Sequence, residues 1–107
     1  MRGLDIYRII KSDMMGFTIS EQFFTCKDKA LQKFDENVEE YRTSEYLAKD
    51  KDVIEHNLST KSLSIKEKLP NKLKSAMACL WYKCSHEYDE WDITVEHLDL
   101  EKIEITN

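Results

Sequence analysis

Alternation of apolar and polar positions predicts strands near both ends of the chain. Residues 4–10, LDIYRII, alternate at first and then become apolar, which is typical of a strand. After a turn over residues 11–16, we expect residues 17–24 to return antiparallel to it. The clearest alternation is WDITVE over residues 91–96, which directs Trp91, Ile93 and Val95 toward a core. An extended segment follows to residue 105.

A helix is predicted from residue 25 to about residue 50. Its period is clear to about Arg42, and residues 43–50 are either a frayed continuation or a second short turn. Ala30, Phe34, Val38 and Tyr41 recur at steps of four, four and three, so they form one apolar stripe. Thr25 and the acid three residues later have the form of a capping box. Lysines come early and acids late, which opposes the helix dipole, so this helix needs a surface to pack against.

The middle of the chain is harder to interpret. Residues 50–61 show no period and are expected to be irregular. SLSIKEKL, from Ser62, alternates, and Pro70 then marks a turn. Residues 73–84 fit either a strand or a helix, and we favour the strand because a hairpin into residues 91–96 would then follow. The sequence therefore predicts a single domain, 1–107, of the α+β class, with an antiparallel sheet of about four or five strands and one long helix (about 25–50) packed on one face.

Composition indicates where in the cell the protein acts and which kinds of chemistry it lacks. The first ten residues contain Arg2, Asp5 and Arg8, which interrupt any apolar stretch, so we expect no secretory signal. No run is long and apolar enough for a membrane span, and the three cysteines fit a reducing cytoplasm. No motif for nucleotide binding, zinc hydrolysis or a serine nucleophile occurs. We therefore expect no enzyme activity, no cofactor and no membrane partner.

Charge is distributed unevenly. Residues 84–107 carry eight acids against one lysine. We expect these carboxylates to form one continuous outward surface, because carboxylates along a strand can occupy the sites that phosphates occupy in a nucleic-acid-binding partner. The predicted partner-binding residues are Glu87, Asp89, Glu90, Asp92, Glu96, Asp99, Glu101 and Glu104.

A basic segment precedes the acidic one and supports a different hypothesis. Seven lysines against three acids fall within residues 51–83. A direct nucleic-acid site would use Lys61, Lys66, Lys68, Lys72 and Lys74. Arginine and interleaved aromatic residues, which single-strand binding favours, are absent from residues 61–74. Solvated lysines that protect an edge strand are the simpler interpretation.

Two cysteines and a histidine offer a third alternative. Cys79, Cys84 and His86 could belong to a metal site or a thiol enzyme. The spacing C-x4-C-x-H departs from the usual zinc pattern, so we favour ordinary packed or exposed thiols and expect no metal.

Two stretches carry a resemblance. FFTCKDKALQKF and YDEWDITVEHLDL resemble segments of small acidic proteins encoded by phages and mobile elements, of the anti-CRISPR or anti-defence kind. The resemblance implies an inhibitor or modulator of a larger host protein, such as a nucleic-acid enzyme or a defence complex, acting in the host cytoplasm. It transfers no functional residues. A homodimer, formed through an exposed final strand with Ile103 and Ile105, is also left open.

Overall fold

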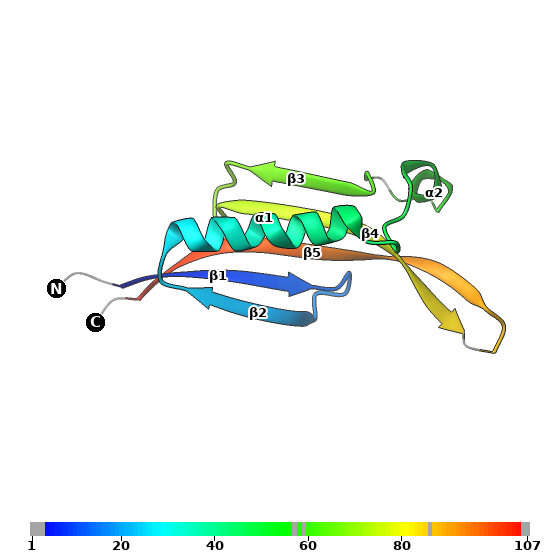
Figure 1. The fold of residues 1–107 in the computed structure, drawn as a ribbon, viewed down its shortest axis with the longest axis horizontal. Coiled ribbons are helices and arrows are strands. Elements are labelled where there is room, and N and C mark those ends of the chain that lie inside the picture. The colour runs from blue at the N-terminus through cyan, green and yellow to red at the C-terminus, as the bar shows by residue number, and fades with distance from the viewer. Residues whose placement is uncertain (1–3, 57, 59, 86, 106–107) are drawn as a thin grey trace.

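Five antiparallel strands form a single sheet that dominates the structure. The computed structural model describes residues 4–56, 58, 60–85 and 87–105. The strands are β1 (Leu4–Ser12), β2 (Thr18–Phe24), β3 (Leu63–Glu67), β4 (Lys74–Ser85) and β5 (Glu90–Ile105), and the helices are α1 (Lys27–Thr43) and α2 (Asp50–Glu55). The order across the sheet is β2-β1-β5-β4-β3 (Figure 1). The alternating pattern thus gives half-buried strands, with β5 at the centre.

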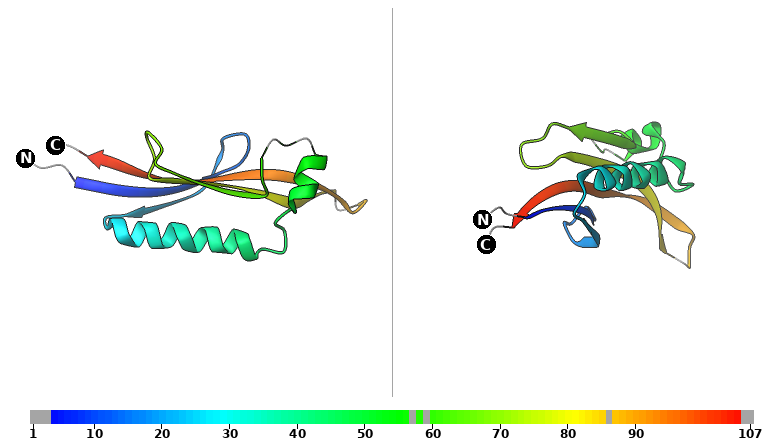
Figure 2. Two further views of the ribbon diagram at one scale, coloured as in Figure 1. Left: turned by 90° about the horizontal axis from the view of Figure 1, so that it is seen from above. Right: turned by 60° about the vertical axis from the view of Figure 1, so that its left-hand side comes forward.

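Helix α1 covers one face of this sheet. Ala30, Phe34, Val38 and Tyr41, the predicted stripe, are all buried. They pack against Ile9 of β1 and against alternate residues of β4 and β5. Seen from above, α1 lies along one side of the sheet (Figure 2, left). The predicted capping box is not formed, because the N-cap is Cys26 and no side chain caps the helix. Packing against the sheet therefore stabilises α1 despite its unfavourable charge order.

The prediction of one long helix over residues 25–50 is wrong, and with it the predicted fold class. The structure is mainly a five-stranded antiparallel sheet with two shorter helices. The chain leaves α1 at Thr43 and runs beside β4, where Leu47 bridges Leu80. It then forms α2 within residues that we expected to be irregular.

Helix α2 packs on the opposite face of the sheet from α1. Its buried Val53 joins Ala48, Cys79, Ile93 and Val95 in a second core cluster. Ala78 and Leu80, which alternate with Cys79 along β4, belong instead to the α1 cluster. The sheet thus contacts one helix on each face, and residues 44–49 carry the chain around its edge. One continuous helix could not cover both clusters, because they lie on opposite faces of the sheet.

Strand β5 is central, which overturns the expectation of an exposed final strand. It pairs with β1 on one side and β4 on the other, and Ile103 lies opposite Ile6. The open edges are β2 and β3. The stretch predicted over residues 73–84 is a strand, as we favoured, and corresponds to β4 (Lys74–Ser85). The molecule measures 59 × 27 × 22 Å, and the β4–β5 hairpin projects from one end, beyond both helices (Figure 1).

Candidate partner-binding site

The C-terminal carboxylates separate into two groups. Glu96, Asp99, Glu101 and Glu104 lie along the part of β5 that runs through the body of the sheet. Glu87, Asp89, Glu90 and Asp92 lie in or next to the turn of the β4–β5 hairpin. The expected single acidic surface is therefore divided between two regions of an elongated molecule.

Within the body of the sheet, the carboxylates of Glu96, Asp99 and Glu101 have partners in the same chain. Glu96 accepts a hydrogen bond from the Tyr41 hydroxyl at 3.0 Å, under α1. Asp99 accepts one from the Ser75 hydroxyl at 2.7 Å and lies 3.1 Å from the Lys72 ammonium.

The Arg8 guanidinium donates a hydrogen bond to the Glu101 carboxylate, with 2.5 Å between nitrogen and oxygen. This hydrogen bond raises the pKa of Arg8. The pKa of Tyr41 is also raised, first by burial and then by the neighbouring Glu96 carboxylate. Glu104 lies opposite Asp5 of β1. Because strand positions alternate between faces, Glu96 lies on the α1 face while Asp99 and Glu101 lie on the other. Glu96, Asp99 and Glu101 thus stabilise the fold through contacts within the chain.

The hairpin turn presents its carboxylates differently. Asp89 has a positive φ of 52° and accepts a hydrogen bond from the Trp91 indole N–H at 3.2 Å. The same carboxylate lies 3.3 Å from the Lys83 ammonium. Glu87 and Glu90 are exposed, and neither forms an ion pair within the described part of the chain. The contacts of Asp89 thus stabilise the turn, and the carboxylates of Glu87 and Glu90 are directed to solvent.

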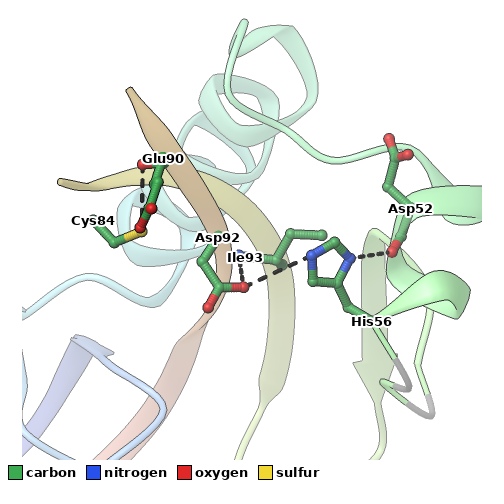
Figure 3. A network of polar contacts seen from close by, with 6 residues as sticks. All are labelled: Asp52, His56, Cys84, Glu90, Asp92 and Ile93. Carbon is green, nitrogen blue, oxygen red and sulfur yellow. Dashed lines mark hydrogen bonds and ion pairs between the residues drawn. The ribbon is translucent and has the colours of Figure 1, made fainter. Parts of the chain in front are cut away.

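Asp92 connects the hairpin to α2. His56, at the end of α2, places Nδ1 2.9 Å from the Asp52 carbonyl oxygen and Nε2 3.8 Å from an Asp92 carboxylate oxygen (Figure 3). The same carboxylate accepts a hydrogen bond from the Ile93 N–H at 2.7 Å. The His56 ring also packs edge-on against Trp81, with 5.4 Å between ring centroids. These contacts fix the base of the hairpin.

Aromatic side chains accompany the hairpin carboxylates. Tyr88 is 71% exposed, and Tyr82 and Trp91 are each 43% exposed. Tyr46, from the segment after α1, stacks on Trp91 with 6.1 Å between centroids. Next to this pair is an open cavity of about 500 Å³, lined by Tyr46, Trp81, Trp91 and Glu45. Alternation correctly predicts that Ile93 and Val95 are buried, but Trp91, expected to be buried with them, is exposed.

Two of the five lysines of the predicted nucleic-acid site form ion pairs within the chain. Lys74 lies 3.1 Å from Asp35 and 3.7 Å from Glu67, and Lys72 contacts Asp99. Lys61, Lys66 and Lys68 are exposed. The structure therefore does not gather the five lysines into one solvent-facing group.

The cysteines have different environments. Cys79 is buried under α2, and burial raises the pKa of its thiol. Cys84 is the extra residue of a β-bulge, with its thiol 3.3 Å from the Glu90 carbonyl oxygen (Figure 3). His86, the third predicted ligand, lies outside the described residues. Within the part of the chain that the structure describes, no group of three or more His, Cys, Asp or Glu side chains could hold a metal ion.

Sequence reasoning missed two surfaces. One is the aromatic cavity, because Tyr46 meets Trp81 and Trp91 only after the chain turns around the sheet edge. The other is the β1–β2 hairpin with its open edge. It exposes Met14, Met15, Phe17, Ile19 and Phe23. Five large apolar residues within ten positions were a visible signal for this second surface.

Comparisons with known proteins give no relative for this chain. No protein-family model matches it, and searches of curated proteins and of solved structures found no match. Among the described residues, none of the helices has the length and apolar character needed to cross a membrane.

Proposed function

We propose that this chain is a non-enzymatic binding protein that docks the β4–β5 hairpin onto a larger protein. The observation that carries the proposal is the composition of the projecting turn. It combines the solvent-directed carboxylates of Glu87 and Glu90 with the exposed rings of Tyr88 and Trp91. Large aromatic residues with a polar handle dominate the binding energy of many protein interfaces.

Charge indicates the kind of partner. Residues 82–92 contain four acids and one lysine, and that lysine is paired with Asp89. A basic groove, such as one that holds nucleic-acid phosphates, complements this surface and would accelerate the encounter. We therefore propose modulation or inhibition of a nucleic-acid enzyme or a defence complex in the cytoplasm. The phage or mobile-element origin rests on the resemblance described above.

Affinity capture with charge-neutralised variants tests the proposal. The double variant Glu87→Gln, Glu90→Gln removes two charges from the hairpin turn. The matched control, Glu36→Gln, Glu40→Gln, removes two from the exposed side of α1. We expect a host protein captured by the wild type to be lost with the hairpin variant and retained with the control. Equal capture by all three proteins would reject the hairpin as the docking element.

The two alternatives have weaker support. Direct nucleic-acid binding would have to use Lys61, Lys66 and Lys68, because Lys72 and Lys74 are already paired. A gel shift that weakens as salt is raised would support that alternative. A metal or thiol site would need Cys79, which is buried, to act with Cys84, which is exposed. Stoichiometric zinc in the purified protein would support it.

A further inference from the structure

The aromatic cavity at the base of the hairpin has the composition of a cation site. Three of its four lining residues are Tyr46, Trp81 and Trp91, and the fourth is the carboxylate of Glu45. Aromatic faces attract cations through their negative quadrupole, and a nearby carboxylate adds a charge and hydrogen-bond acceptors. We propose that this cavity binds an arginine side chain of the protein partner.

The cavity is built in advance of binding, because its parts are tied to the sheet. The Trp81 N–H donates to the Tyr46 carbonyl at 2.8 Å, and the Ala48 N–H donates to the Cys79 carbonyl at 2.9 Å. The Tyr46 N–H donates to the Ser44 hydroxyl at 3.1 Å. The first two bonds hold the backbone at Tyr46 and Ala48 against β4, and the third is local to the segment after α1. A site whose side chains are held before binding loses less entropy when the ligand enters.

The rings are also held by side-chain contacts. Trp91 is stacked on Tyr46 and hydrogen-bonded through its indole N–H to Asp89. Trp81 packs against the His56 ring. Two independent contacts thus orient Trp91, and one orients Trp81, so the shape of the cavity does not depend on a ligand.

The charges around the cavity favour a cation. Glu45 is exposed and has no ion-pair partner within the described residues. Lys83 lines an adjoining cavity with Tyr82, but its ammonium is paired with Asp89 at 3.3 Å. Asp92 adds a further carboxylate at the base of the hairpin, beside His56. The uncompensated charge nearest the rings is therefore negative.

Arginine fits this cavity better than lysine does. Its guanidinium is planar and weakly hydrated, so it stacks on aromatic rings at a small desolvation cost, and it binds a carboxylate through two hydrogen bonds. Arginine, tyrosine and tryptophan are also the residues most enriched at interface hot spots. The inference rests on the proposed function for the source of the arginine, because a basic groove supplies such side chains.

Titration with defined peptides tests the cavity without the partner. The chain has two tryptophans, and both line the cavity, so intrinsic fluorescence reports on it directly. The probes are acetyl-Gly-Arg-Gly-amide and its citrulline counterpart, a neutral compound of nearly the same shape, at constant ionic strength. We expect saturable binding of the arginine peptide and roughly tenfold weaker binding of the citrulline peptide, since the cation supplies the attraction.

Variants identify the residues responsible. Tyr46→Ala and Glu45→Gln should each weaken binding of the arginine peptide several-fold, while Tyr88→Ala, on the hairpin turn but outside the cavity, should leave it unchanged. Equal affinity for both peptides, or no saturable change in the millimolar range, would overturn the inference. The result is independent of the capture experiment. Loss of arginine binding leaves the acidic hairpin untouched, and failure of capture leaves the peptide titration valid.

Discussion

Replacing Phe34 with alanine tests whether the α1 face carries the main core. Phe34 is 0% exposed and belongs to the larger core cluster, together with residues of β1, β4 and β5. Truncation of a fully buried phenylalanine costs about 3–5 kcal/mol, from lost apolar burial and the cavity left behind. A domain of this size has a free energy of unfolding of about 5–15 kcal/mol, so the variant should lose a large share of it.

Urea denaturation followed by circular dichroism measures this loss. With a slope of about 1–3 kcal/mol per molar urea, a loss of about 3–5 kcal/mol lowers the midpoint by about 1–5 M. The matched control is Phe23→Ala on β2, because Phe23 is 58% exposed on the face without α1. That substitution should cost under about 1 kcal/mol. A loss below about 1 kcal/mol for Phe34→Ala, or equal losses for both variants, would refute the assignment of the core.

Three further predictions concern thiols, pH and self-association. Cys79 should resist a thiol reagent in the folded protein while the other two cysteines react, because it is buried and its pKa is raised; three fast-reacting thiols would contradict its placement. The Asp50 carboxylate accepts a hydrogen bond from the Ser62 N–H, and this bond lowers the pKa of Asp50. The bond therefore stabilises the folded protein at pH values above the ordinary aspartate pKa, and this stabilisation is lost as the pH falls through the lowered pKa. Unfolding midpoints of the wild type and of Asp50→Ala should therefore differ near neutral pH and converge once the pH falls below the lowered pKa; a constant difference would count against this bond. Finally, the open β2 edge should support weak self-association, and Ile19→Lys should abolish it in sedimentation equilibrium, whereas an unchanged association constant would exclude this edge.

Local periodicity predicts the elements of this protein better than their arrangement. The step of three or four residues correctly marks the buried stripe of α1, and alternation correctly predicts burial of Ile93 and Val95. The apolar stripe has its last member at Tyr41, but the pattern leaves open whether residues 43–50 continue the helix, whereas α1 ends at Thr43. The reason for that ending is tertiary: Leu47 bridges Leu80, and the chain then crosses to the other face. Such competition between local preference and packing is invisible in a single sequence.

In the candidate site, too, the sequence predicts which residues are present better than it predicts how they are arranged. Acid content near the C-terminus is plain from the sequence, but whether a carboxylate is available depends on its neighbours across the sheet. Asp99 and Glu101 are neutralised by Lys72 and Arg8, which lie 27 and 93 positions away in the sequence. Register therefore decides that the carboxylates of Glu87 and Glu90 remain for a partner while those of Glu96, Asp99 and Glu101 do not.

The most direct test of the docking hairpin is site-specific photocrosslinking in host extract. A benzoylphenylalanine replaces Tyr88 in the hairpin turn or, as the matched control, Phe17 in the β1–β2 hairpin, since the two side chains are 71% and 67% exposed. We predict a discrete crosslinked partner from position 88 and none from position 17. The same partner captured from position 17 but not from position 88 would contradict the account.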